Sequence, residues 1–95
     1  FGDVEVDFAK GEVRRRGAPV DLSAMEFKLL AYLVEHRGRV LTRDQLLQDV
    51  WGYASAPLSR TVDVHVASLR HKLEPDPPKP RFILTLHGRG YRFAG

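Results

Sequence analysis

"SRTVDVHVASLRHKLE", residues 59–74, carries its apolar side chains at helical spacing. At about 100° per residue, four of these side chains fall within an arc of roughly 60°. They are Val62, Val66, Leu69 and Leu73. Val64 lies roughly 170° from the centre of that arc by the same arithmetic. The stretch therefore predicts a helix that packs on a domain along one narrow edge and turns a valine to the opposite side.

Small, polar and basic residues surround Val64 on that opposite side. They are Arg60, Thr61, Ala67, Ser68, His71 and Lys72. A single surface valine needs no special explanation. A valine on a basic helix that precedes a second basic segment favours a face that a partner covers.

Two further helices are predicted before this one. The first, "SAMEFKLLAYLVEHRG", begins with Ser23 and Glu26 at the spacing of a capping box and ends at Gly38. Its apolar residues cover a wide arc, so we expect this helix to be substantially buried. They are Met25, Phe27, Leu29, Leu30, Leu33 and Val34.

The second predicted helix, "TRDQLLQDVWG", repeats this design. Thr42 and Gln45 are placed to form its cap, and Gly52 ends it. Its apolar residues gather on one side, and they are Leu46, Leu47, Val50 and Trp51. The segment that follows, "YASAPL", carries no charge.

Strands are predicted at both ends of the chain. Residues 3–8, "DVEVDF", alternate strictly, so Val4, Val6 and Phe8 are expected on one buried side. "EVRRR" and "VDL" follow after turns at Gly11 and Gly17, which indicates an antiparallel meander.

After the third helix, the proline-rich "PDPPKP" leads to "RFILTL" and "GYRFAG". These two runs flank "HGRG" and predict a β-hairpin with a cationic tip. The order of strands, three helices and a hairpin predicts an α+β fold, a winged helix-turn-helix that occupies residues 1–95 as a single domain.

The length and composition limit what the chain can be. Its 95 residues suffice for one domain with one modest core. The sequence has no apolar run long enough for a transmembrane helix and no signal-peptide pattern. It has no cysteine, which excludes disulfides and fits a cytoplasmic protein. Because the chain does not begin with Met, we expect it to be part of a longer protein.

No enzyme or metal site is predicted. The sequence lacks a glycine-rich phosphate loop, a GxSxG motif and a cysteine nucleophile. His65 and His71 are six residues apart, which places them on different sides of a helix, and His36 and His87 lie in other elements. We expect Asp63 to pair with a nearby cation such as Arg60.

The net charge of +3 is spread unevenly. Residues 1–59 hold 8 Lys/Arg and 9 Asp/Glu, whereas residues 60–95 hold 7 and 3. A basic final third suits a polyanion, although a solvated surface would explain the charge equally well. The second helix of a helix-turn-helix enters the DNA major groove, where an exposed valine can contact the C5-methyl of thymine.

The segment "RTVDVHV", with Trp51-Gly52 before it and "GRGYRF" after it, resembles the winged-helix effector domain of OmpR/PhoB-family response regulators. The resemblance covers the chain from its first strand to its last residue. It implies sequence-specific binding of promoter DNA for transcription regulation in a two-component phosphorelay, with the helix at 59–74 in the major groove and the wing at 82–93 in the minor groove. It also implies a receiver domain in cis, homodimers on direct repeats, and an RNA polymerase contact through the loop at 52–59.

The resemblance also assigns roles to single residues. The positions of Trp51, Arg60, His65 and Tyr91 are expected to contact phosphates, and Thr61, Val64 and Ser68 to face bases. The same surface includes His71 and Lys72. In the wing, His87 stands at the usual arginine position and Arg89 lies at the tip, so we expect Arg89 to enter the minor groove.

This sequence departs from the family pattern at the reading helix. Ala67 and Ser68 stand where well-studied members have arginines, which predicts base readout that depends less on guanidinium groups. The loop "YASAPL" lacks the acidic residues often found on the polymerase-facing loop. The alternative function is a winged helix that binds an acidic protein partner through the same basic face.

Overall fold

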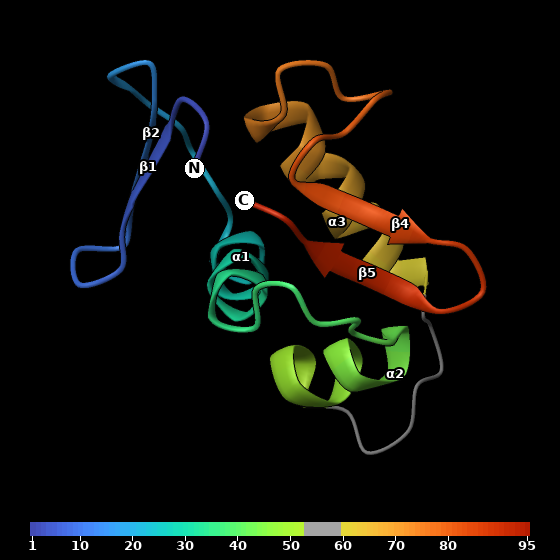
Figure 1. Cartoon of the computed structure of the whole chain (residues 1–95). Helices are drawn as coiled ribbons and strands as arrows, with labels where there is room; N and C mark the ends of the chain where they lie inside the picture. Colours follow the sequence, from blue (N-terminus) through green and yellow to red (C-terminus); the bar gives the residue numbers. More distant parts are fainter. Residues whose placement is uncertain (53–59) are drawn as a thin grey trace.

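Two antiparallel sheets flank three helices in the computed structural model, which describes residues 1–52 and 60–95 (Figure 1). The first sheet comprises β1 (Val4–Asp7), β2 (Glu12–Arg15) and β3 (Ala18–Pro19). The helices are α1 (Ala24–Glu35), α2 (Arg43–Leu46), which continues as a π-helical segment over Leu47–Trp51, and α3 (Arg60–Leu73). The second sheet is the hairpin of β4 (Ile83–Leu86) and β5 (Gly90–Phe93). The predicted α+β winged helix-turn-helix is confirmed.

The N-terminal sheet has the predicted meander topology, with β2 between β1 and β3. The predicted third strand, "VDL" at 20–22, is wrong in position, because Ala18 and Pro19 already pair with β2 directly after the turn at Gly17. Both turn glycines, Gly11 and Gly17, have positive φ angles, which glycine adopts without strain. Val4 and Val13 are buried, but the prediction for Phe8 is wrong, because 48% of its surface is exposed. β1 ends at Asp7, so Phe8 lies in the turn and the strand alternation no longer directs it inward.

The predicted cap of α1 is confirmed in full and that of α2 in part, because the Gln45 side chain donates to the Tyr32 hydroxyl at 3.2 Å instead of returning to Thr42. At the start of α1, Ser23 and Glu26 form the reciprocal capping box. At the start of α2, the hydroxyl of Thr42 accepts a hydrogen bond from the Gln45 amide at 3.1 Å. Leu29, Leu30 and Leu33 are fully buried, and the other apolar residues of α1 pack against the core.

The second helix does not continue as an α-helix to Gly52. Its last part, Leu47–Trp51, is π-helical and ends at Gly52 in the left-handed conformation. The wider turn buries Leu47 and Val50 together while Trp51 contacts His65 of α3. The apolar pattern does not distinguish this turn from an α-helical one.

The third helix has the predicted orientation. Its four stripe residues, Val62, Val66, Leu69 and Leu73, are at most 1% exposed. Val64 is 58% exposed, so the valine opposite the core stripe does face outward.

The C-terminal hairpin pairs Ile83 with Phe93 and Leu86 with Gly90. Leu41 forms a bridge to β5 through Tyr91. A side chain at Gly90 would lie 2.1 Å from the Leu41 carbonyl oxygen, so this second glycine of "HGRG" allows the close approach.

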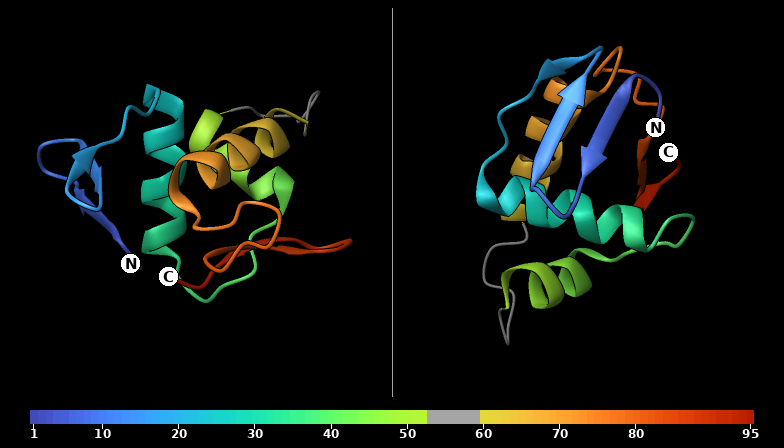
Figure 2. Two further views of the ribbon diagram at one scale, coloured as in Figure 1. Left: turned by 90° about the horizontal axis from the view of Figure 1, so that it is seen from above. Right: turned by 90° about the vertical axis from the view of Figure 1, so that its left-hand side faces the viewer.

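The hairpin extends away from the N-terminal sheet, and its tip lies at the same end of the molecule as the start of α3 (Figures 1 and 2). The chain termini lie near each other, and the Phe1 ring packs edge-on against Phe93 at 5.0 Å. Within residues 1–52 and 60–95, no helix has the length and apolar character that spanning a bilayer requires.

Candidate nucleic-acid interface

The face of α3 that lies opposite the core combines one apolar side chain with polar and basic ones. Arg60, Val64 and His71 are exposed on it, and Thr61 is half-buried. Among the described residues, Val64 and Phe8 are the large apolar side chains that remain exposed, and they lie on different elements. An apolar group on a helix of this character is suited to contact a thymine methyl in the major groove.

His65 is held in a fixed orientation beside this face. Its Nδ1 lies 2.8 Å from the Thr61 carbonyl oxygen, which can only accept a hydrogen bond. Nδ1 therefore carries a hydrogen, and Nε2 remains for another partner. The Trp51 ring packs against the imidazole at 5.0 Å in an edge-on arrangement. The structure thus brings together two of the predicted phosphate-contacting residues.

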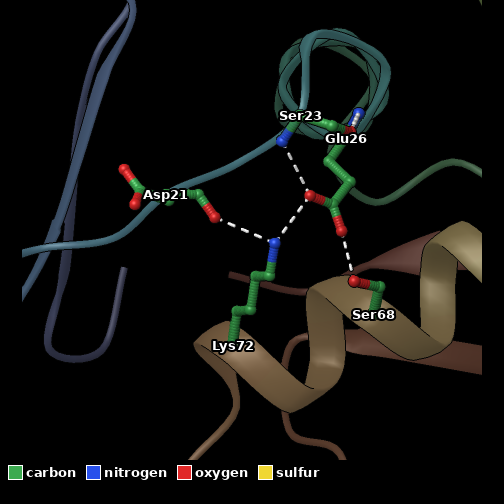
Figure 3. Close-up of polar contacts among 5 residues, drawn as sticks. All are labelled: Asp21, Ser23, Glu26, Ser68 and Lys72. Carbon is green, nitrogen blue, oxygen red and sulfur yellow. Dashed lines mark hydrogen bonds and ion pairs between the residues drawn. The ribbon is translucent and has the colours of Figure 1, made fainter.

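A carboxylate from α1 reaches α3 in a group that we call the Glu26 cluster, consisting of Ser23, Glu26, Ser68 and Lys72 (Figure 3). Glu26 accepts hydrogen bonds from the Ser23 amide and the Lys72 ammonium, each at 2.8 Å. Its other oxygen accepts one from the Ser68 hydroxyl. The Lys72 ammonium also donates to the Asp21 carbonyl oxygen at 2.9 Å.

The Glu26 carboxylate is buried yet ionised. Only 5% of the residue is exposed, and this burial opposes ionisation. The hydrogen bonds from Lys72, Ser68 and Ser23 outweigh burial and lower the pKa of Glu26 to about 2. At neutral pH the group is therefore an acceptor for all three donors.

This cluster changes how two predicted contact residues present themselves. Ser68 and Lys72 are both directed to Glu26 rather than standing free (Figure 3). Ser68 nevertheless lines a surface hollow of about 200 Å³ together with Ser23, Glu26, Val64 and His65. Their contacts with DNA stay predictions, and for Lys72 one of the three ammonium hydrogens remains after the bonds to Glu26 and the Asp21 carbonyl.

A second group, which we call the Asp63 cluster, links α2, α3 and β5. Asp63 accepts hydrogen bonds from Arg43 at 2.7 Å and from the Tyr91 hydroxyl at 2.5 Å. The cation beside Asp63 is therefore Arg43 of α2. The sequence had suggested a nearby cation such as Arg60. Burial and then the bond to Asp63 raise the pKa of the Tyr91 hydroxyl. Burial opposes ionisation of Asp63, but the bonds from Tyr91 and Arg43 outweigh it and lower the pKa of that carboxyl.

Tyr91 is therefore a residue of the interior. Only 4% of it is exposed, and its hydroxyl hydrogen is directed to Asp63. Arg43 and Arg70 both lie over its ring, at 5.3 and 5.6 Å from the centroid. The predicted phosphate contact of Tyr91 remains a prediction, and the structure favours a role in holding the hairpin to α3.

The hairpin tip carries the two predicted wing residues. His87 and Arg89 are both exposed there. The Arg89 amide donates to the Leu86 carbonyl at 2.8 Å, which closes the turn and leaves the guanidinium outside it. This is the placement that insertion into a neighbouring groove requires.

Two residues that the sequence reasoning missed anchor the hairpin to α3. Arg70 donates to the Ile83 carbonyl and to the Thr85 hydroxyl, each at 2.7 Å through the same nitrogen. Glu74, 1% exposed, accepts from the backbone amides of Arg81, Phe82 and Ile83. The sequence signal for the role of Glu74 was a glutamate at a helix end before a proline-rich connection. That signal does not specify which backbone amides the glutamate binds.

Within residues 1–52 and 60–95, no group of three His, Cys, Asp or Glu side chains is placed to hold a metal ion. Apart from Gly52, the predicted polymerase-facing loop, residues 52–59, lies outside the described residues. The predicted site residues on α3 are Arg60, Thr61, Val64, His65, Ser68, His71 and Lys72, and those on the hairpin are His87, Arg89 and Tyr91.

Comparison with known proteins gives a consistent result. The family model described as "Transcriptional regulatory protein, C terminal" matches residues 17–93. The chain is 45% identical over 92 residues to the DNA-binding response regulator MtrA of Mycolicibacterium smegmatis, covering 97% of this chain and 40% of MtrA. It is 44% identical to the sensory transduction protein RegX3 of the same organism, covering 99% of this chain and 41% of RegX3.

Solved structures agree with these sequence matches. The response regulator DrrB of Thermotoga maritima, an OmpR/PhoB homologue, superposes with a TM-score of 0.89 at 36% identity, covering all of this chain and 43% of DrrB. The DNA-binding domain of Klebsiella pneumoniae RstA, in complex with the RstA box, gives 0.87 at 35% identity over 99% of this chain and 93% of that domain. The chain thus spans about two fifths of the length of the curated relatives that it matches.

Proposed function

The chain belongs to the C-terminal DNA-binding effector domains of OmpR/PhoB-family response regulators, and we propose that it regulates transcription by placing α3 in the major groove of promoter DNA and the hairpin in the adjacent minor groove. The exposed Val64 on the basic face of α3 carries this proposal. The hairpin tip, with Arg89 exposed, lies at the end of the molecule where α3 begins (Figure 1).

We further propose a wider setting, supported by the fact that the chain spans about two fifths of the length of its curated relatives. In the full-length protein a receiver domain lies in cis, and its phosphorylation brings two copies together on direct repeats. RNA polymerase is contacted through the loop at 52–59, and the protein acts in the cytoplasm, where bacterial DNA lies. The chain supplies DNA binding and not catalysis.

A salt titration tests DNA binding against the alternative of an acidic protein partner. The 95-residue chain is first used to select sites from a random double-stranded DNA pool. Affinity for the selected site should then fall steeply between 50 and 200 mM salt, because each neutralised phosphate releases counterions. No sequence-dependent binding to any DNA at low salt would overturn the proposal and favour a protein-interaction module.

A matched pair of charge-removing variants locates the interface. Arg60→Ala should reduce the salt slope by about 1, as expected for one lost phosphate contact. Lys79→Ala removes the same charge from the exposed connection between α3 and β4, and its slope should equal that of the wild type. A slope for Arg60→Ala that equals those of Lys79→Ala and the wild type would contradict a phosphate contact at the start of α3.

A further inference from the structure

The hydrogen of the Ser68 hydroxyl is already used inside the protein. A serine hydroxyl has one hydrogen to donate and two lone pairs that accept. The Ser68 hydroxyl donates to the carboxylate of Glu26 (Figure 3). What remains on this oxygen is its capacity to accept.

The direction of this hydrogen bond is fixed by the other partners of Glu26. The Ser23 amide and the Lys72 ammonium are both donors, and each lies 2.8 Å from the same carboxylate oxygen. The low pKa of Glu26 keeps the group ionised at neutral pH, so it has no proton to give to Ser68. The reverse bond, in which Ser68 accepts from Glu26, is thereby excluded.

Ser68 stands where a base can reach its oxygen. It lies one helical turn after the exposed Val64, on the same side of α3. Both side chains line the same hollow, which also includes His65. A base edge that approaches Val64 therefore comes close to an oxygen that can only accept.

We propose that Ser68 is a specificity-determining residue that accepts a hydrogen bond from an exocyclic amine in the major groove, and that Glu26 sets this polarity from beneath. In that groove, only cytosine N4 and adenine N6 offer donors, whereas guanine O6 and thymine O4 are acceptors. The inference rests on the proposed binding of α3 in the major groove.

The charge of Glu26 acts in the same direction. An anion behind the hydroxyl attracts an amine and disfavours a carbonyl oxygen or a phosphate at this position. Lys72 offsets part of this negative charge, because its ammonium donates to Glu26 and to the Asp21 carbonyl. Well-studied relatives are expected to have an arginine here, which only donates. Ser68 would therefore reverse the hydrogen-bond preference at this base and not merely weaken it.

Deletion of single amines from the selected site tests the proposal. Each cytosine is replaced in turn by 2-pyrimidinone and each adenine by purine, which removes the exocyclic amine alone. The wild-type chain should lose affinity about 3- to 10-fold at one position, the range expected for one hydrogen bond. Ser68→Ala should show no loss at that position beyond the general effect of weaker base pairing.

A second variant reports on Glu26. In Glu26→Gln the side-chain amide can donate to Ser68, which frees the hydroxyl hydrogen to point outward. Selection with this variant should then admit guanine or thymine at the position where the wild type requires cytosine or adenine. Val64→Ala is the matched control, because it should lose a thymine preference while keeping the amine requirement.

The outcomes separate the two proposals. Failure of the wild-type chain to bind any DNA selectively overturns the proposed function itself. Selective binding in which Ser68→Ala chooses the same base, and loses as much as the wild type when the amine is deleted, overturns only the inference about Ser68. If Glu26→Gln does not fold by circular dichroism, the comparison of wild type with Ser68→Ala still decides.

Discussion

Two buried carboxylates hold α3 in place, and they differ in what they bind. Glu74, at the end of the helix, accepts hydrogen bonds from three backbone amides at the start of the hairpin. Glu26 reaches α3 from α1 and accepts from the side chains of Ser68 and Lys72 (Figure 3). Glu74 thus fixes the end of α3 against the hairpin backbone, whereas Glu26 fixes side chains on the surface that we propose faces DNA.

This difference separates stability from recognition. Backbone amides are the same in every sequence, so the contacts of Glu74 can position the hairpin but cannot read a base. The contacts of Glu26 decide which hydrogen-bonding group Ser68 shows to a base. Substitutions at the two sites should therefore affect different measurements.

Glu74→Ala should have the largest effect on stability. It leaves three amide groups at the start of the hairpin without their acceptor, and each unsatisfied buried donor costs about 1 to 3 kcal/mol. We expect a loss of about 3 to 5 kcal/mol in the free energy of unfolding, measured by urea denaturation. Glu74→Gln, which keeps one acceptor oxygen, should lose less. An unchanged urea midpoint for Glu74→Ala would contradict the anchoring role.

Acid should remove the contribution of Glu26. Its pKa falls from 4.5 to about 2 on folding, so its carboxylate stabilises the fold above pH 4.5. That stabilisation, at most about 3 kcal/mol, is lost as the pH falls from 4.5 towards 2. The stability difference between wild type and Glu26→Gln in urea should shrink over this range. A difference that is constant with pH would show that Glu26 is not held ionised by its partners.

Tyr91→Phe should lower stability by about 1 kcal/mol, the typical net worth of one hydrogen bond, because it removes the bond to Asp63. The affinity for the selected DNA site should stay at the wild-type value, since the hydroxyl is directed inward. Unchanged thermal stability together with weaker DNA binding would instead support the phosphate contact that the sequence predicted for Tyr91.

Arg89→Ala should have the smallest effect on the fold, because the side chain is exposed at the hairpin tip. We expect unchanged stability and a salt slope reduced by about 1, measured by gel shift. His87→Ala is the comparison at the neighbouring tip position. If Arg89→Ala binds as tightly as the wild type, with the same salt slope, the placement of Arg89 in the minor groove is contradicted.

Periodicity predicted the core face of α3, because residues on one side of a helix recur at a fixed angle whatever they contact. The caps of α1 and α2 were predictable for the same local reason. Phe8 was placed wrongly because alternation fixes a side only as far as the strand continues, and β1 ends at Asp7. The π-helical segment at Leu47–Trp51 gives no distinct apolar pattern.

The candidate site was predictable in position but not in hydrogen bonding. The sequence placed Val64, Ser68 and Lys72 on one face, and in the structure Val64 and Ser68 line the same hollow while Lys72 is directed to Glu26. It did not show that Glu26, 42 residues before Ser68, would bind the hydroxyl. The sequence also did not show that Asp63 pairs with Arg43 of α2 instead of with a cation of α3. Such contacts depend on how elements distant in sequence pack together, which local spacing does not specify.

Selecting sites from a random DNA pool with wild type and Val64→Ala in parallel tests most directly whether the exposed face of α3 reads the DNA bases. The substitution removes methyl groups without changing charge or the core stripe. Relaxed preference for thymine at one position, with an unchanged salt slope, is the predicted result. Recovery of the same site by both proteins, with thymine equally required at every position, would contradict it.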